Sequence, residues 1–339
     1  MAITIKDIAR ESGYAVSTVS RALNNQPDVS VEAKKHIQEI VAQHGFVPND
    51  NARRLKQQQS KSIAIVVQGA FNAFFAPVLE CIQSEIAAAG YTATVKTLTE
   101  MDNEVNAALR LCRERKPLGV IFLGGNIHTF EAEFAQISLP CVLATAGSGT
   151  LQFENLSVVT IDDTEAMRRG TEFLLNSGHR HIGVIGGKIP GNYISELRYK
   201  GLVSAMQKAG IAFDDKYYED AAFTSEGGYR AMQTLLTRCR DITAVQCMSD
   251  TTAMGAIRAV YDAGLRVPED ISVLGFDGIA VCSYIVPRLS TLCQPAAEIA
   301  RKSVACLLAQ INGGSAEPSV LLPVTLQDGE SVCAPQSKQ

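Results

Sequence analysis

TIKDIARESGYAVSTVSRALNN, residues 4–25, decides the fold of the first part of this chain. Thr4 is suited to cap a helix with Asp7 three positions later, and Gly13 is suited to end that helix. Beyond a short turn, apolar residues recur at helical spacing, and the positions between them carry small hydroxyls and one Arg. The stretch therefore predicts two short helices joined by a tight turn.

A third helix is expected in VEAKKHIQEIVAQHG, residues 31–45, with Ser30 as its N-cap. A helix, a turn with Gly and a short second helix have the layout of a helix-turn-helix. Hydroxyls on the short helix can bond phosphates or base edges in the major groove, and an Arg can bond guanine through two hydrogen bonds. The motif alone leaves a generic three-helix bundle as the alternative.

The residues of this segment resemble the DNA-binding head of the LacI/GalR transcriptional regulators. The resemblance rests on TIKDIARESG, STVSRALNN and GFVPN. It implies that DNA is contacted by Thr4, Val16, Ser17, Thr18, Ser20, Arg21 and Asn24. Of these, Val16 and Ser17 are expected to read the operator sequence. Ala15 stands where many members carry a Ser that caps the second helix, and losing such a cap costs about 1 kcal/mol.

The polar stretch VPNDNARRLKQQQSKS, residues 47–62, precedes a long hydrophobic pattern. Asn49 can cap a helix on which Ala52 and Leu55 share a face, but a free helix of about eight residues is marginal in water. By resemblance, the stretch is a hinge helix that forms in the DNA minor groove, with Leu55 as a wedge between base pairs. DNA contacts are therefore expected from Asn49, Ala52, Arg53 and Leu55. A flexible linker is the alternative.

From residue 62 onward, short β-rich runs alternate with amphipathic helical segments. The expected strands are SIAIVVQ, YTATVKTL, GVIFLGG, PCVLATA, VVTIDD, HIGVIGG, AVQCMSD, SVLGFDG and STLCQP. Helices are expected in segments such as FFAPVLECIQSEIAAAG, EAMRRGTEFLLNSG, ELRYKGLVSAMQKAG and TTAMGAIRAVYDAG. The alternation predicts an α/β body with doubly wound parallel sheets covered on both faces. The strands are too many for one compact sheet, so two lobes are expected, with a ligand between them at the carboxyl ends of the strands.

No catalytic or metal-binding motif is recognisable. GGNIH and GGKIPGN are glycine-rich but follow neither GxGxxG nor GxxxxGK[ST], and no pair of His has metal-ligand spacing. Asp162 and Asp163 are adjacent, so they point to opposite sides of a strand end and are expected to cap or hinge. The nine Cys include no CxxC, which favours buried free thiols in a reducing cytoplasm. Neither an enzyme nor a cofactor is expected.

Polar and aromatic side chains follow the expected strands instead. From the residues alone, candidates for binding a small polar cyclic ligand are Asn72, Phe74, Phe75, Arg198, Phe223, Ser249, Asp250 and Asp277. Aromatic side chains can cover a ring, while Arg and Asp can bond hydroxyls or ring nitrogens. Each residue taken singly could equally be part of the core or a helix cap.

The resemblance to LacI/GalR regulators extends through this body. SGHRHIGVIGG, ELRYKGL, FTSEGGY, SDTTAMGAIRAV, GLRVPEDISVLGFDG and VPRLSTLCQP look like the family's effector-binding core, which is similar to periplasmic sugar-binding proteins. The expected effector contacts are then Phe71, Asn72, Phe75, Thr145, Arg198, Phe223, Ser249, Asp250 and Asp277. Thr145 and Gly278 stand where members commonly carry other polar anchors, and QDGES lacks a usual Arg. A common hexose is therefore not assumed; a modified or phosphorylated sugar, or weak binding, stays open.

The expected organisation is a helix-turn-helix domain over residues 1–48, a hinge over 49–61 and a periplasmic-binding-protein-like body over 62–339. The body is expected to consist of one subdomain at about 62–160 with 293–323, and another at about 161–290 with 324–339. Residues 1–61 hold nine Lys and Arg against six Asp and Glu, a net charge of +3, whereas the rest of the chain is net −7. A basic head fits an anionic partner.

The whole sequence predicts a transcriptional regulator, expected to repress a carbohydrate-use operon. Its expected partners are double-stranded DNA with a palindromic operator, a small sugar-like effector and a second copy of the chain in a homodimer. No signal peptide or apolar run of about 18 residues is recognisable, so a cytoplasmic protein without a membrane partner is expected. A protein co-regulator in place of the small effector is one alternative. A solute-binding protein would have no use for residues 1–61.

Overall fold

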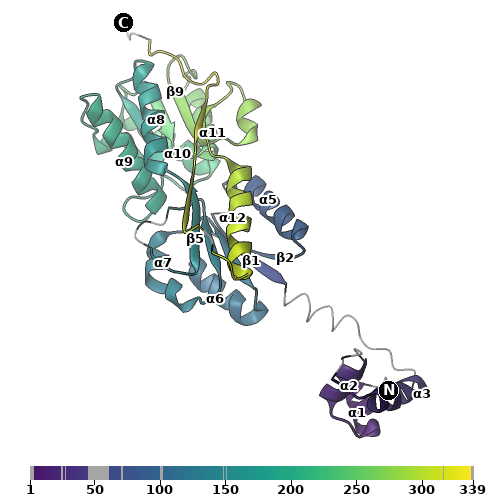
Figure 1. Cartoon of the computed structure of the whole chain (residues 1–339). Coiled ribbons are helices and arrows are strands. Elements are labelled where there is room, and N and C mark those ends of the chain that lie inside the picture. Colours follow the sequence, from purple (N-terminus) through teal and green to yellow (C-terminus); the bar gives the residue numbers. More distant parts are fainter. Residues whose placement is uncertain are drawn as a thin grey trace. The chain divides into compact units, whose positions relative to one another are not determined.

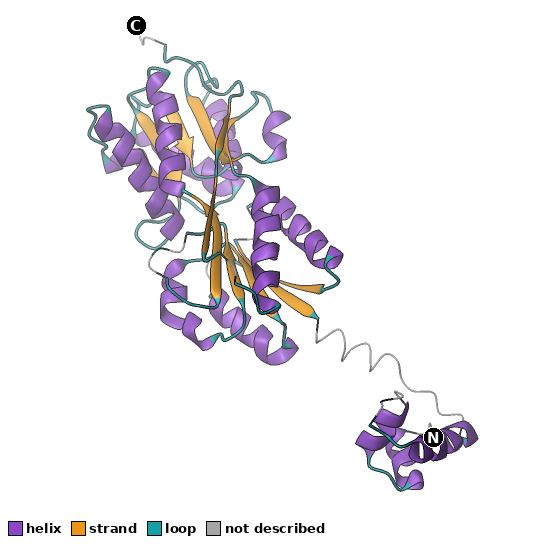
Figure 2. Cartoon of the chain, in the orientation of Figure 1, coloured by secondary structure: helices purple, strands orange, loops and turns teal. Residues whose placement is uncertain are grey.

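The structure, a computed structural model, describes residues 4–23, 26, 28–44, 61–69, 72–99, 102–147, 149, 151–315 and 317–336. The chain forms two compact units, Met1–Gln59 and Ser60–Gln339. The first unit consists of helices, and the second combines helices with strands (Figures 1 and 2). The expected pairing of a small helical head with an α/β body is confirmed.

Three helices make up the described part of the first unit: α1 (Ile5–Ser12), α2 (Val16–Leu23) and α3 (Val31–Gln43). Helical spacing places apolar residues on one face of each helix. These faces form a buried core of Ile8, Ala9, Val19, Ala22, Val29, Ala33, Ile37 and Ile40. The three predicted helices are confirmed.

The helix ends of this unit follow from their capping residues. The backbone N–H and the hydroxyl of Thr4 donate hydrogen bonds of 3.0 and 2.6 Å to the Asp7 carboxylate at the start of α1. Gly13 ends α1 with a φ of 71°, a left-handed conformation that glycine adopts without strain. At the start of α3, the Ser30 hydroxyl accepts a 3.2 Å hydrogen bond from the Ala33 N–H.

The second unit holds two sheets, each with six strands among the described residues. The first has the order β11-β5-β4-β3-β1-β2, with bounds Ser319–Leu322, Leu156–Ile161, Cys141–Ala144, Gly119–Leu123, Ser62–Gln68 and Thr92–Leu98. The second has the order β12-β10-β9-β8-β6-β7, with bounds Thr325–Gln327, Ser290–Cys293, Ser272–Asp277, Ala244–Cys247, Ile182–Gly186 and Tyr218–Asp220. Neighbouring strands are parallel except β10 and β12, which are antiparallel.

Each sheet forms a lobe with the helices that cover it. Lobe A is the first sheet with α5 (Phe75–Ala88), α6 (Glu104–Arg115), α7 (Ile127–Glu133) and α12 (Ala296–Ile311). Lobe B is the second sheet with α8 (Asp163–Asn176), α9 (Tyr193–Lys208), α10 (Ser225–Arg238) and α11 (Asp250–Asp262). In Figure 1, α5 and α12 lie together in lobe A, and α8 lies beside α9 in lobe B.

Side-chain alternation along β1 shows why both faces of a sheet are buried. Ile63, Ile65 and Val67 belong to the core that includes α5 and α12, whereas Ala64 and Val66 belong to the core that includes α6 and α7. A strand buried on both faces must be apolar throughout, as the sequence SIAIVVQ is. The expected doubly wound sheets in two lobes are confirmed.

The chain passes between the lobes after Ile161, after Cys293 and after Leu322. In each sheet the strand order reverses, with β1 between β2 and β3, and β6 between β7 and β8. Such a reversal opens a crevice at the carboxyl ends of the strands. Three strands were not predicted, β7, β11 and β12, and all three are short strands at sheet edges. Among the described residues, no helix has the length and apolar character to cross a membrane.

Candidate functional site

The outward face of α2 presents side chains that do not contribute to the core. Val16 and Ser17 are exposed, while Thr18 and Ser20 are half-buried. The Arg21 side chain is 63% exposed. An exposed Val beside hydroxyls and an Arg suits contact with DNA, where a methyl group meets thymine and polar groups meet phosphates or bases.

Neither end of α2 is held by a strong side-chain contact of Ala15 or Arg21. The carbonyl of Ala15 accepts hydrogen bonds from the N–H groups of Thr18 (2.9 Å) and Val19 (3.0 Å), but the Ala15 side chain supplies no cap. At the other end, the guanidinium of Arg21 lies 3.1 Å from the Asp28 carboxylate. An exposed ion pair contributes about 0–1 kcal/mol, so Arg21 can exchange this partner for DNA at little cost.

Several residues with predicted roles lie outside the described part of the chain. They are Asn24, Asn49, Ala52, Arg53, Leu55 and Phe71. The expected hinge over residues 49–61 lies outside it as well, except for Lys61. Thr4 is described and occupies the exposed start of α1.

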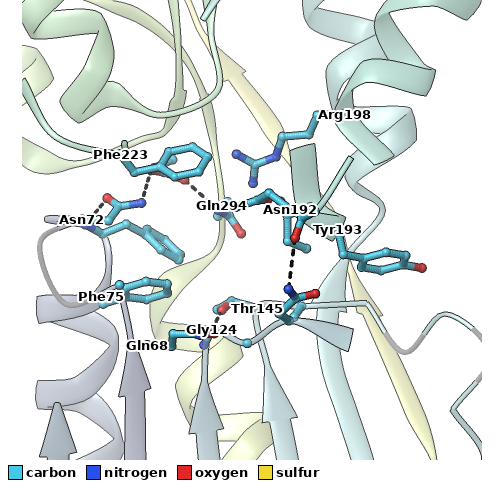
Figure 3. Close-up of a pocket in the computed structure, with 18 residues that line it drawn as sticks. Gln68, Asn72, Phe75, Gly124, Thr145, Asn192, Tyr193, Arg198, Phe223 and Gln294 are labelled. Carbon is cyan, nitrogen blue, oxygen red and sulfur yellow. Dashed lines mark hydrogen bonds between the residues drawn. The ribbon is translucent and has the colours of Figure 1, made fainter. Parts of the chain in front are cut away.

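A cavity of about 160 Å³ lies between the lobes at the carboxyl ends of their strands (Figure 3). It is lined by Gln68, Gly69, Asn72, Phe74, Phe75, Gly124, Gly125, Asn126, Thr145, Ala146, Gly191, Asn192, Tyr193, Ile194, Arg198, Phe223, Asp277 and Gln294. In Figure 3, Gln68 and Phe75 of lobe A face Phe223 and Arg198 of lobe B across the cavity.

Two side-chain amides from lobe A reach lobe B beside the cavity. The Asn72 Nδ2 donates a 3.1 Å hydrogen bond to the Asp277 Oδ2, and the Asn126 Nδ2 donates a 3.0 Å bond to the Gly191 carbonyl. Asn72 is itself held in place, because its Oδ1 accepts a 3.1 Å bond from the Phe74 N–H. The polar residues that follow β1 and β3 therefore bridge the lobes.

Arg198 of α9 is the buried cation of the cleft. Its Nε donates a 2.8 Å hydrogen bond to the Asp163 Oδ1, its Nη1 donates to the Met248 carbonyl, and its guanidinium carbon lies 3.6 Å from the centre of the Phe276 ring. Burial raises the pKa of Asp163, and the Arg198 charge opposes that rise. Arg198 is thus fixed by lobe B and presents its remaining donors to the cavity.

Asp277 ends β9 in a backbone conformation that non-glycine residues rarely adopt, with a φ of 117°. Its carboxylate accepts hydrogen bonds from Asn72 and from the Gln294 Nε2, the latter at 2.8 Å. Burial raises the pKa of Asp277 above its ordinary value, while the Arg198 charge works against this. Strained, buried and titratable, Asp277 has the properties of a functional residue.

Thr145 follows β4 with a φ of 69°, a second left-handed position at a strand end. Its hydroxyl accepts a 3.1 Å hydrogen bond from the Gly124 N–H, as Figure 3 shows. Left-handed backbone is costly for a β-branched residue. The position is therefore held by its surroundings rather than by local preference.

Of the nine residues predicted to contact an effector, six line the cavity: Asn72, Phe75, Thr145, Arg198, Phe223 and Asp277. Ser249 and Asp250 do not line it. The Ser249 hydroxyl caps α11 by accepting from the Thr252 N–H at 3.2 Å. The Asp250 carboxylate faces the backbone beyond β9, accepting from the N–H groups of Gly278 and Ile279. Their side chains are engaged within lobe B, so the expectation of cavity contact is corrected for both.

Other lining residues were not predicted. The polar ones are Gln68, Asn126, Asn192, Tyr193 and Gln294. Each follows or ends an expected strand, so the strand-end rule that selected Asn72 and Asp277 could have found them. Asp162 and Asp163 begin α8 as expected of capping residues, since the Asp162 Oδ1 accepts a 2.9 Å bond from the Glu165 N–H.

The cleft combines aromatic rings with amide, hydroxyl, carboxylate and guanidinium groups. Rings can cover the apolar faces of a small cyclic ligand, and the polar groups can bond its edge. Among the described residues, no group of three or more His, Cys, Asp or Glu is arranged to hold a metal ion. The arrangement is that of a binding site for a small polar molecule.

Comparison with known proteins gives two family matches. Residues 4–49 match the model of bacterial regulatory proteins of the lacI family, and residues 171–332 match a periplasmic binding protein-like domain. The HTH-type transcriptional regulator MalR of Clostridium butyricum is 32% identical over 332 residues, covering 97% of this chain and 99% of MalR. The ribose operon repressor of Haemophilus influenzae is 33% identical over 311 residues, covering 91% of this chain and 92% of that protein.

Solved structures show the same architecture. A complex of the transcriptional regulator CelR with cellobiose has a TM-score of 0.71 and 26% identity, and the match covers 97% of this chain and 99% of CelR. The lac repressor dimer bound to operator and an anti-inducer has a TM-score of 0.71 and 23% identity, with 98% of this chain and 100% of that chain covered. At this lower identity, the likeness to the lac repressor concerns the fold alone.

Proposed function

This chain belongs to the lacI family of bacterial regulatory proteins, and we propose that it is a transcriptional repressor whose affinity for operator DNA is controlled by a small ligand. The observation that carries the proposal is the presence, in one chain, of an exposed polar α2 face and a cavity lined by both lobes. A ligand between two lobes can shift the population of their arrangements and so change DNA binding.

We propose that α2 enters the major groove, with Val16, Ser17 and Arg21 facing base edges. Residues 1–48 act as the DNA-binding domain and 49–61 as the segment that links ligand to DNA. The hinge residue Leu55 has the role of a wedge in the minor groove. The family membership supports this division of labour, as does the exposure of the α2 side chains.

The ligand is proposed to be a sugar or sugar derivative. Phe75 and Phe223 on opposite sides of the cavity can cover a ring, and Arg198, Asp277 and Thr145 can bond its hydroxyls. The relatives that support this class are the ribose operon repressor and CelR, which was solved with cellobiose. Members of this family are regulators, and we propose no catalytic activity for the chain.

The active form is proposed to be a homodimer in the bacterial cytoplasm, where the operator DNA is. One three-helix head makes few contacts, so two heads on a palindromic site are needed for specific binding. Tyr284 and Val286 of lobe B support an interaction surface, because these large apolar side chains are 84% and 85% exposed and stand two positions apart in sequence.

Binding of purified protein to DNA tests the proposal. Fluorescence anisotropy would be measured with inverted-repeat fragments from around the gene that encodes this chain, with scrambled repeats as the control. Each fragment would be tested with ribose, cellobiose, sugar phosphates and no addition. We expect tight binding to one repeat, a steep fall of affinity with salt and a shift with one ligand. Equal binding to repeat and scrambled fragments under all conditions would contradict the proposal.

A further inference from the structure

Asp250, the first residue of α11, is a fully buried carboxylate outside the cavity. Its Oδ2 accepts hydrogen bonds from the backbone N–H groups of Gly278 (2.7 Å) and Ile279 (2.8 Å). Its Oδ1 accepts a 2.5 Å hydrogen bond from the Thr291 hydroxyl. The carboxylate therefore binds the backbone of the loop that begins directly after Asp277.

A glycine in β9 leaves the space that the Asp250 carboxylate occupies. A Cβ added to Gly275 of β9 would lie 2.2 Å from the Asp250 Oδ1, so the carboxylate occupies space that any larger residue would fill. The loop also packs closely against Cys293 of β10, since a Cβ on Gly278 would lie 2.6 Å from the Cys293 side chain. Asp277, at a φ of 117°, begins a turn that is fixed from both sides.

Glu104 is a buried carboxylate at a helix start in lobe A. It is fully buried and is the first residue of α6. Its Oε1 accepts hydrogen bonds of 2.7 Å from the Asn126 backbone N–H and from the Thr129 hydroxyl. Its Oε2 has no hydrogen-bond partner among the described residues. The oxygen that is used, Oε1, bonds the backbone of the loop that follows β3.

The two anchors have the same relation to their own strands, although β3 lies beside β1 whereas β9 is separated from β6 by β8. Each begins the helix that leads into a central strand, α6 into β3 and α11 into β9, and each holds the loop that follows that strand. The positive end of the helix dipole stabilises a carboxylate at such a position. A side chain that lines the cavity and bridges the lobes lies in or next to each held loop: Asn126 lies within the loop of lobe A, and Asp277 directly precedes the loop of lobe B.

We propose that Asp250 and Glu104 are positioning residues of the cleft: each fixes, through backbone N–H groups, the loop that presents a ligand-facing side chain. The inference rests on the proposed function only in taking the cavity as the ligand site. Neither residue touches the ligand. Their effect is to hold the conformations of Asp277 and Asn126, which would change if the loops lost these hydrogen bonds.

Amide hydrogen exchange of the full-length protein tests this without any ligand. In the wild type, the amides of Asn126, Gly278 and Ile279 should be as protected as neighbouring strand amides, although they lie in loops. Exchange at ordinary loop rates would overturn the proposal. This measurement requires no variant and so does not depend on whether a variant folds.

Variants of Asp250 separate positioning from general stability. Asp250→Ala should speed exchange at Gly278 and Ile279 by about tenfold or more, since both buried donors lose their acceptor, while α8 and α9 stay protected. Asp250→Asn should restore protection, because its amide oxygen can accept from both N–H groups and its nitrogen can donate to the Thr291 oxygen. Thr291→Val is the matched control, as it removes the hydroxyl that bonds the Asp250 Oδ1 and should leave the loop protected. Equal exchange in the Ala and Asn variants would contradict the proposal.

Glu104→Ala should speed exchange at Asn126 and leave Gly278 and Ile279 unchanged, because the anchors act in separate lobes. A calorimetric titration with ribose and with cellobiose adds a binding measurement. A probe that binds the wild type should bind Asp250→Ala about tenfold more weakly and Asp250→Asn nearly normally. If neither sugar binds the wild type, the proposed ligand class fails, while the exchange results still decide whether these residues hold the loops.

Discussion

The side-chain amide of Asn72 donates a 3.1 Å hydrogen bond to the carboxylate of Asp277, and the two residues belong to different lobes. Because Asp277 is buried, its carboxylate needs donors, and lobe A supplies one of them. A ligand hydroxyl that bonds Oδ2 of Asp277 would share or replace the Asn72 amide, and one that bonds Oδ1 would do the same with the Gln294 amide. The contact between the lobes and the proposed ligand binding therefore involve the same carboxylate.

Asn72→Asp should make the distance between the lobes sensitive to pH. Two carboxylates at this contact repel once both are ionised, so the lobes should separate more at about pH 8 than at about pH 5. Amide hydrogen exchange at residues 72–75 and 277–279 of the full chain measures how far the lobes open. Asn72→Ala is the control, because it removes the donor without adding charge. The same pH response in both variants would contradict the explanation.

Asp277→Asn should flatten the dependence of stability on pH. An acid whose pKa is raised by burial binds more protons when folded than when unfolded, so the free energy of unfolding falls as pH rises from about 4 through the raised pKa. Asp163, Asp250 and Asp277 all have raised pKa values for this reason. Melting temperatures across this range should fall less steeply for Asp277→Asn than for the wild type. An unchanged slope would show that Asp277 does not titrate in this range.

Arg198→Met should destabilise the body as well as abolish ligand binding. Removing the guanidinium leaves Asp163 buried beside an apolar side chain, and breaking one partner of a buried pair costs about 3–5 kcal/mol. The double variant Arg198→Met with Asp163→Asn removes the orphaned charge and should recover part of that loss. Urea unfolding measures both. If the double variant were no more stable than the single one, the cost would come from lost packing over Phe276 instead.

Arg21→Ala should weaken operator binding by about 1–3 kcal/mol and relax the base preference at one position. Asp28→Ala is the matched control, because it breaks the Arg21–Asp28 ion pair but keeps the guanidinium. We expect this control to bind operator as well as the wild type or better. If both substitutions lowered affinity equally, the ion pair would matter rather than contact between Arg21 and DNA.

Leu55→Ala should lower operator affinity by at least about tenfold, since a wedge between base pairs needs a large apolar side chain. Melting temperature and sugar binding should stay at wild-type values. Substituting Gln58 with Ala in the same stretch is the control and should change affinity little. Near-normal affinity of Leu55→Ala would restore the interpretation of residues 47–62 as a simple linker.

The architecture could be predicted from sequence because its signals are local. Short apolar runs rich in β-branched residues, such as SIAIVVQ, favour strands buried on both faces, and Thr4, Gly13 and Ser30 set helix ends by their own chemistry. The edge strands β7, β11 and β12 were missed because they are only three or four residues long, too short for a clear alternating pattern. The family resemblance added the hinge and the roles of the α2 residues, which periodicity alone does not reveal.

The place of the cavity was predicted, and its composition was predicted in part. Residues at strand ends were rightly expected to converge, since parallel strands bring their carboxyl ends to one edge. Whether a strand-end side chain points into the cavity or into its own lobe depends on the loop conformation, which short-range sequence signals do not set. Ser249 caps a helix, Asp250 holds a backbone loop, and Gln294, not among the predicted residues, lines the cavity and bonds Asp277.

Because the chain passes between the lobes after Ile161, Cys293 and Leu322, neither lobe is a continuous piece of polypeptide. Lobe A lacks its helix α12 and its edge strand β11 until residues 296–322 have been synthesised. On the ribosome, the first five strands must therefore wait for nearly the whole of lobe B before the face that α5 shares with α12 can be fully covered. A truncated messenger or a stalled ribosome would release a lobe with an open apolar face, a substrate for chaperones and proteases rather than a partial regulator.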